Sequence, residues 1–238
     1  MKDRQIVLEV SPLGDAQMAS AIAKALRVQD LDVSMLVSKL GAQLLSCVSL
    51  PLYTERENVP RGAIVVDVCQ YLNQNCHRAK LSSIWAPSDD EVDRRGFGHL
   101  VTWMAKHVYT QLLTTGVSLN PIPCGAADVV LYPSQERVDQ ACHFLDNHGV
   151  TQEKDLVILC ADAGSPNRWI PPGLLAQVVD SMKGEAVFAL LAPTPKGVPG
   201  YEALDVVRLP MVPLDLLPAL LTVADAIVAP DTGQAHIA

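Results

Sequence analysis

The sequence has few charged residues and no cluster of one sign of charge. Only 18% of its 238 residues are charged, whereas 49% are hydrophobic. A chain of this composition is expected to bury a core, which excludes an intrinsically disordered protein. Acidic residues outnumber basic ones by 26 to 18, and Lys and Arg form no run. The sequence therefore gives no electrostatic reason to expect binding to nucleic acid or to an anionic membrane surface.

Long hydrophobic runs are also missing. The first apolar run, Ile6 to Val10, is followed by Pro12 and Gly14 and is too short for a signal peptide or a membrane-spanning helix. No other segment reaches the length that a membrane span requires. We therefore expect a cytoplasmic protein with no transmembrane segment.

The sequence shows neither a disulfide framework nor a standard metal-binding motif. Its six cysteines lie in a chain that is larger than a small secreted domain and lacks a secretion signal. The spacing of Cys69, Cys76 and His77 matches no standard zinc pattern, and no fourth ligand is evident. His107 lies singly on an expected helix. We expect reduced, buried or inert cysteines and no metal site.

Short apolar runs alternate with segments of helical periodicity along the first 150 residues. Runs that are apolar on both faces are typical of a parallel sheet covered by helices on both sides. Residues 116–134 contain two glycines and three prolines and are expected to be irregular. We expect strands at 6–10, 31–37 and 62–68, and helices at 16–28, 42–48, 99–115 and 135–147.

The same alternation resumes near residue 151 and predicts a second unit. We expect strands at 155–161, 186–192, 206–209 and 226–229, and helices at 172–182 and 214–224. The prediction is an α/β protein with two Rossmann-like parallel-sheet lobes, residues 1–150 and 151–238. The second lobe is shorter and stops one turn into a helix, so we expect it to be truncated, by about 60 residues.

Three segments carry a resemblance to a known family. They are Val10-Ser-Pro-Leu-Gly-Asp15, Arg168-Trp-Ile-Pro171 and Asp225-Ala-Ile-Val-Ala-Pro-Asp-Thr-Gly-Gln-Ala-His236. In order and spacing they resemble glycosyltransferase family 9, which includes the lipopolysaccharide heptosyltransferases, and the similarity spans nearly the whole chain. The resemblance implies a GT-B fold, with the acceptor bound by the N-terminal lobe and the nucleotide-sugar donor by the C-terminal lobe. It also implies inverting transfer without a metal.

Asp15 is the candidate general base. The resemblance places Ser11 and Gly14 in an acceptor loop before it, after the first strand. Gly14 allows a sharp turn there, so Asp15 is expected at the carboxyl edge of the sheet, where open α/β folds bind ligands. One carboxylate can take the proton of an acceptor hydroxyl in inverting transfer. The alternative is that Asp15 only caps a helix starting at Ala16, a position that Asp favours.

Asp231, Thr232, Gly233 and His236 are the candidate donor-binding residues. They lie where an expected strand ends and a helix begins, so the amides of Thr232 and Gly233 would point at a diphosphate. Thr232 can add a hydroxyl donor, and His236, one turn further on, can face the same ligand. The alternative is an ordinary Asp or Thr cap at the start of a helix.

Ser165 and Arg168 complete the expected donor site. They lie in the loop after the first strand of the second lobe, where a cation would neutralise charge on the departing diphosphate. Many members of the family carry Lys where Arg168 stands. Arg keeps the charge and can bind phosphate bidentately, with a different geometry. The alternative is that Arg168 is a surface cation beside a packed Trp169.

A second departure from the family pattern concerns the nucleotide ribose. Family members often place an acidic residue just after the next strand, whereas segment 191–199 contains none and Glu202 is further along. This absence motivates an alternative hypothesis, a non-catalytic or degenerate GT-B module that binds protein or glycan. A Rossmann-type oxidoreductase is disfavoured, because no Gly-x-Gly-x-x-Gly follows the first strand.

The resemblance also implies the substrates. It predicts transfer of a heptose or related sugar from a nucleotide-diphosphate donor, such as ADP-heptose, to a lipopolysaccharide-type or other cell-surface glycan acceptor. The expected partners are therefore a nucleotide sugar and a glycan or glycolipid, with no cofactor and no nucleic acid. A glycolipid acceptor would bring the protein into peripheral contact with the cytoplasmic face of the inner membrane.

Overall fold

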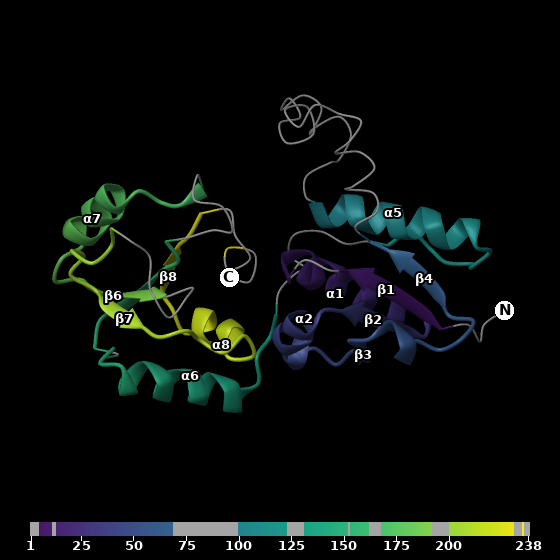
Figure 1. Ribbon diagram of the computed structural model, residues 1–238, viewed down its shortest axis with the longest axis horizontal. Helices are drawn as coiled ribbons and strands as arrows, with labels where there is room; N and C mark the ends of the chain where they lie inside the picture. The colour runs from purple at the N-terminus through teal and green to yellow at the C-terminus, as the bar shows by residue number, and fades with distance from the viewer. Residues whose placement is uncertain are drawn as a thin grey trace, which may run out of the picture. The chain divides into compact units, whose positions relative to one another are not determined.

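The chain folds into two compact α/β units. The computed structural model describes residues 5–10, 13–68, 100–122, 131–151, 153–161, 168–191, 200–230 and 235. The units are Met1–Val130 and Leu131–Ala238. Each contains a four-stranded parallel sheet with helices packed on it (Figure 1). The predicted α/β class with two parallel sheets is therefore confirmed.

The first sheet is built around its central strand, β1. The strands are β1 (Ile6–Val10), β2 (Val33–Val37), β3 (Leu52–Tyr53) and β4 (Ile64–Asp67), in the order β3-β2-β1-β4. All of them pair in parallel. The side chains of Ile6, Val7 and Leu8 are at most 1% exposed, so β1 is covered on both faces. Each such aliphatic side chain stabilises the fold by about 1.5–3 kcal/mol when it is fully buried.

Helices follow the strands in the order that the sequence predicted. Helix α1 (Leu13–Arg27) contacts β1 and β2, and it packs against α5 (Leu100–Thr114), which contacts β4. Helix α2 (Lys39–Leu44) begins three residues earlier than expected, because the Ser38 hydroxyl accepts a hydrogen bond from the Gly41 amide at 3.0 Å. Two 3₁₀ turns, η1 (Leu45–Cys47) and η2 (Arg56–Asn58), complete the described part of this unit.

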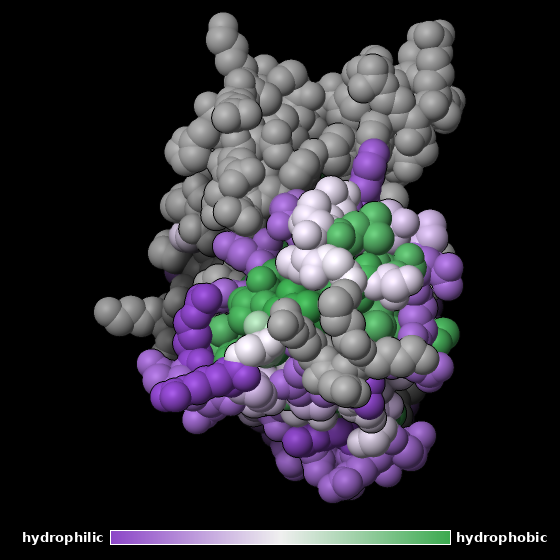
Figure 2. Space-filling view, turned by 90° about the vertical axis from the view of Figure 1, so that its right-hand side faces the viewer, coloured by the Kyte–Doolittle hydropathy of each residue, from purple (hydrophilic) through white to green (hydrophobic). Residues whose placement is uncertain are grey.

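The edge strand β4 is less covered than β1. Val66 is buried, but Val65 is 37% exposed, and Leu113 of α5 is 44% exposed. Figure 2 shows hydrophobic side chains gathered into a patch on one face, with hydrophilic side chains around it. Within the described part of the chain, the strand predicted at 62–68 is therefore covered less completely than its apolar sequence suggested.

The second sheet repeats the arrangement of the first. Its strands are β5 (Asp155–Leu159), β6 (Ala186–Leu191), β7 (Val207–Leu209) and β8 (Ala226–Val228), in the order β7-β6-β5-β8. All of them pair in parallel. Helices α6 (Gln135–Asn147), α7 (Pro172–Ser181) and α8 (Leu217–Thr222) pack on this sheet.

Alternation along β5 divides the second core into two layers. Leu156 and Ile158 pack with residues of α6 and α8 on one face of the sheet. Val157 and Leu159 pack with residues of α7 on the other face. Successive side chains of a strand point to opposite faces, so one apolar run supplies both layers. Figure 1 shows the same division, with α7 on one side of the sheet and α6 and α8 on the other.

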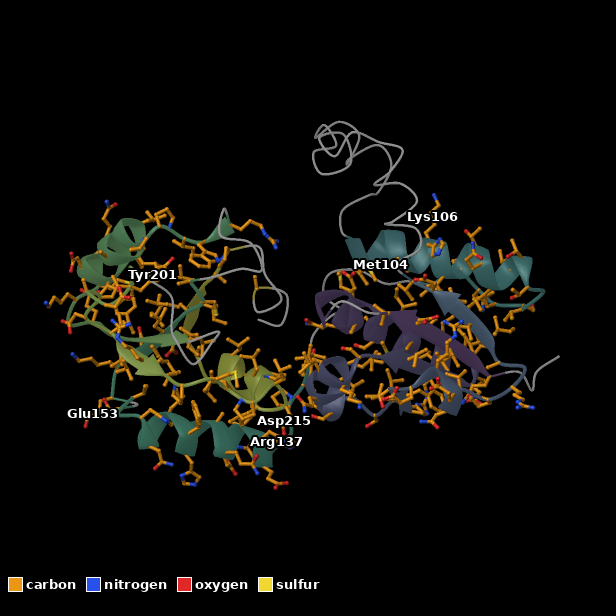
Figure 3. The ribbon with its side chains drawn as sticks, in the orientation of Figure 1. Met104, Lys106, Arg137, Glu153, Tyr201 and Asp215 are labelled. Carbon is orange, nitrogen blue, oxygen red and sulfur yellow. The ribbon has the colours of Figure 1, made fainter. Side chains whose placement is uncertain are left out.

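The boundary between the units lies earlier than predicted. The sequence suggested a division between residues 150 and 151, but the second unit begins at Leu131. Ala141 and Leu145 of α6 are fully buried in the core of the second sheet. Arg137 of α6 also forms an ion pair with Asp215, just before α8, with an N···O distance of 2.8 Å (Figure 3). Helix α6 therefore belongs to the second unit, and the predicted boundary is wrong.

Three cysteines lie in the described part of the chain: Cys47 and Cys142 are half-buried, and Cys160 is buried. Burial raises the pKa of the Cys47 thiol above its ordinary value, and a backbone hydrogen bond and the charge of Lys24 oppose this more weakly. Cys69, Cys76 and Cys124 lie outside the described residues. None of the helices in the described ranges is long and apolar enough to cross a membrane.

Candidate functional site

Each sheet has one point at which its strand order reverses. In the first sheet the chain runs from β1 to β2 and β3 on one side, and then returns to β4 on the other side. In the second sheet it runs from β5 to β6 and β7, and then returns to β8. Open α/β sheets bind ligands beyond the carboxyl ends of the two strands that flank such a reversal. These ends are those of β1 and β4 in one unit and of β5 and β8 in the other.

Asp15 lies in the helix that comes after β1 in the chain. Helix α1 begins at Leu13, so Asp15 lies in its first turn, and its side chain is half-buried. The positive end of the helix dipole stabilises a carboxylate at this position. The helix was expected to start at Ala16, and the alternative to a catalytic role made Asp15 its cap. The predicted start and the capping alternative are both wrong, because Gly14 is already helical. Ser11 lies outside the described residues.

A second carboxylate, Asp67, ends the neighbouring strand and was not recognised in the sequence. It pairs with Glu9 of β1 in the sheet register and is exposed. The Nε2 atom of His107, on α5, lies 3.3 Å from the Asp67 carbonyl oxygen. Asp15 and Asp67 therefore occupy the same edge of the first sheet. The sequence feature that could have identified Asp67 is an acidic residue near the end of an otherwise apolar run.

Arg168 is the described part of the predicted loop after β5. Its side chain is exposed, whereas those of the next two residues, Trp169 and Ile170, are half-buried against the α7 face of the second sheet. The Ile170 amide donates a hydrogen bond to the Ala161 carbonyl at 3.0 Å. The chain on both sides of the loop is thus fixed to the core. The alternative interpretation of Arg168 was a surface cation beside a packed Trp169, and the described side chains fit it. A surface cation can still bind an anionic ligand.

Tyr201 holds both sides of this loop. Its ring is buried in the layer between α7 and the sheet, at 1% exposure. Its hydroxyl donates to the carbonyl oxygen of Ile170 and lies 3.4 Å from that of Ala161. No local sequence pattern singles out this tyrosine, because its partners are 31 and 40 residues away along the chain.

Glu202 has a local role in the same segment. Its carboxylate accepts a hydrogen bond from the Gly200 amide at 2.8 Å. Gly200 has a φ of 93°, in the left-handed region that favours glycine. Glu202 therefore caps a turn.

The predicted donor motif follows the carboxyl end of β8. Ser165, Asp231, Thr232, Gly233 and His236 all lie outside the described residues, so their roles stay predictions. Ala235, the described residue of the motif, is helical and exposed. Asp225 fixes the start of β8, because its carboxylate accepts from the Leu156 amide at 2.8 Å while its own amide donates to the Leu156 carbonyl at 2.9 Å.

The described residues contain no group of three or more His, Cys, Asp or Glu side chains that could hold a metal ion. The charged side chains singled out above are the carboxylates of Asp15 and Asp67 in the first unit and the guanidinium of Arg168 in the second. Such a set can transfer a proton at one place and neutralise an anionic leaving group at another.

No protein-family model matches the sequence, and no curated protein matches it either. Solved structures do match over nearly the whole chain. A family 9 glycosyltransferase from Veillonella parvula has a TM-score of 0.57 at 14% identity, with 99% of this chain and 78% of that one covered. The E. coli heptosyltransferase WaaC with ADP has a TM-score of 0.59 at 14% identity, with 98% and 82% covered.

A third match is the E. coli ADP-heptose lipopolysaccharide heptosyltransferase II, with a TM-score of 0.55 at 14% identity and 97% and 80% of the two chains covered. At this level of identity the likeness shows the fold. Of these three structures, one is a family 9 glycosyltransferase and two are heptosyltransferases, the kinds of protein that the sequence motifs resemble. The predicted GT-B type of α/β fold, with two Rossmann-like lobes, is therefore confirmed.

Proposed function

We propose that this protein is an inverting glycosyltransferase that moves a heptose or related sugar from a nucleotide diphosphate to a lipopolysaccharide-type or other cell-surface glycan. The observation that carries the proposal is the position of Asp15, in the first turn of the helix that follows the central strand of a heptosyltransferase-like fold. A carboxylate at this strand end lies where open α/β sheets bind their ligands.

In the proposed reaction, Asp15 acts as the general base. Its carboxylate takes the proton of the acceptor hydroxyl as that oxygen attacks the anomeric carbon of the donor sugar. The bond between the anomeric carbon and the diphosphate oxygen breaks, and its electron pair leaves with the nucleotide diphosphate. Attack from the face opposite the leaving group inverts the anomeric configuration.

The donor side of the proposal rests on Arg168 and the motif after β8. An exposed guanidinium next to two residues anchored in the core can neutralise the negative charge that develops on the leaving diphosphate. We assign Ser165, Asp231, Thr232, Gly233 and His236 to the same donor, with ADP-heptose as the nucleotide sugar to test first. The reaction would take place in the cytoplasm, at the face of the inner membrane that carries a glycolipid acceptor.

Metal independence is part of the proposal. One structure with the same fold, the E. coli glycosyltransferase TibC, is iron-containing; it matches with a TM-score of 0.52 at 10% identity, and this chain covers 56% of it. We propose that the cationic side chain of Arg168 takes the part that a metal ion would otherwise play on the diphosphate. Transfer should then persist in the presence of a chelator.

A binding module without catalysis is the second candidate. The segment after β6, residues 192–199, contains no acidic residue, although family members often use one there for the ribose. A lobe that has lost this contact could keep the fold and bind protein or glycan instead.

Calorimetric titration with ADP-, UDP- and GDP-sugars separates the two candidates. We expect saturable binding of one of these, weakened at least about tenfold in Arg168→Gln because a charge-assisted contact to phosphate is lost. Arg61→Gln, at another exposed arginine, is the matched control and should bind as the parent does. Absence of nucleotide-sugar binding in the parent chain would favour the binding module.

A further inference from the structure

We propose that Tyr201 is the positioning residue for Arg168. This inference rests on the proposed function, because it takes the leaving diphosphate as the ligand of Arg168. Tyr201 lies 33 residues beyond Arg168 in the sequence and in a different segment of the second unit, after β6. Its hydroxyl joins the two ends of the loop that carries the cation.

The Tyr201 hydroxyl contacts two backbone carbonyls. Tyr201 donates to the Ile170 carbonyl, and the same hydroxyl lies 3.4 Å from the Ala161 carbonyl, which also accepts from the Ile170 amide at 3.0 Å. The hydroxyl therefore lies within hydrogen-bond distance of a carbonyl at each end of the loop. Since Ala161 continues from β5, the tyrosine ties the returning end of the loop to the central strand of the sheet.

This attachment acts on Arg168 because only Trp169 separates Arg168 from Ile170. Trp169 packs against the same core layer as Ile170, whereas Arg168 is exposed. A long, exposed guanidinium loses conformational entropy when it binds an anion, and that cost falls if its backbone is already fixed. Anchoring at Ile170 therefore fixes the backbone two residues from the charged side chain.

Tyr201 is itself held from two sides. A Cβ atom added to Gly200 would meet Cγ of Pro172 at 3.2 Å, so the backbone before Tyr201 lies close against the start of α7. Arg208 of β7 donates to the carbonyl oxygens of Tyr201 at 2.7 Å and of Glu202 at 2.9 Å. Figure 3 shows Tyr201 inside the second unit, next to α7. The hydroxyl therefore has a defined position from which to hold the loop.

The test compares Tyr201→Phe with the parent chain. This substitution removes one oxygen atom and keeps the buried ring. We expect the Ile170 amide to exchange with solvent about tenfold faster, the factor that the loss of one hydrogen bond supports. Trypsin should also cut faster after Arg168. Tyr132→Phe, at a tyrosine that is 75% exposed, is the matched control and should leave both rates unchanged.

The second readout is the affinity for ADP, measured in a double-mutant cycle. Tyr201→Phe should weaken ADP binding about tenfold in the parent, and should have little further effect in the Arg168→Gln background. A purely structural tyrosine would instead weaken binding by the same factor in both backgrounds, and that result would overturn the inference.

The two proposals fail in different ways. If the parent chain binds neither ADP nor an ADP-sugar, the proposed function is wrong and the ligand assigned to Arg168 falls with it. If the parent binds ADP but Tyr201→Phe exchanges the Ile170 amide at the parental rate, the proposed function stands and the positioning role is wrong. Unchanged far-ultraviolet circular dichroism of Tyr201→Phe shows that either result comes from a folded chain.

Discussion

At the scale of single residues, several polar side chains of the second unit bind the backbone rather than each other. Tyr201, Arg208, Glu202 and Asp225 each form hydrogen bonds to main-chain groups. Such partners cannot be predicted from local sequence, because the Asp225 carboxylate and the Leu156 amide are 69 residues apart. Buried backbone groups need hydrogen-bond partners, so these side chains contribute to the stability of the second unit.

Asp225 gives a test at this scale. We expect Asp225→Ala to lower the free energy of unfolding by about 1–2 kcal/mol, because the Leu156 amide loses its partner at 2.8 Å. Asp205→Ala is the matched control, since Asp205 is 86% exposed and its ion pair with Lys183 is 3.6 Å long. Such a surface pair contributes little. Equal urea midpoints for the two variants would show that Asp225 does not hold β8 in place.

At the scale of elements, the apolar runs predicted strands well and short elements poorly. The runs at 6–10 and 155–161 correspond to β1 and β5, because burial on both faces requires a continuous apolar sequence. Strand β3 was missed, since its two residues, Leu52–Tyr53, are too short to show a period. Helix α8, expected over 214–224, is limited to Leu217–Thr222.

Helix α6 was predicted with the right bounds but assigned to the wrong unit. The sequence gives its periodicity, whereas the core that its apolar face joins depends on contacts with distant strands. Residues 116–134 were expected to be irregular, and the boundary between the units falls within this stretch. Periodicity therefore predicts the helix, and only the packing shows to which domain it belongs.

Leu145→Ala tests this assignment. We expect a loss of about 2–5 kcal/mol, because a fully buried leucine is removed from the core of the second sheet. Amide exchange should become faster in β5 and β6 and stay unchanged in β1 and β2. The control is Leu174→Ala on α7, where the side chain is 52% exposed and the expected cost is under about 0.5 kcal/mol. Faster exchange confined to β1 and β2 would place α6 in the first unit.

At the scale of the whole molecule, the two units repeat one topology, and in the sequence the predicted site residues follow β1, β5 and β8, which flank the two reversals of strand order. The sequence predicted this arrangement because the motifs directly follow apolar runs. The structure has Asp15 in the first turn of the helix after β1 and Arg168 in the segment between β5 and α7, while their roles stay predictions. The sequence could not reveal Asp67 or Tyr201, whose significance depends on which strands and loops become neighbours in the fold.

The most direct test of the central claim is the rate of sugar transfer by Asp15→Asn. With ADP-heptose and a lipopolysaccharide-type acceptor, we expect the parent chain to release ADP as it glycosylates the acceptor. Asp15→Asn should be slower by at least about 100-fold, because an amide cannot take the acceptor proton. Asp146→Asn, at an exposed aspartate of α6, should retain the parental rate. Transfer by Asp15→Asn at the parental rate would contradict the assignment of Asp15 as the base.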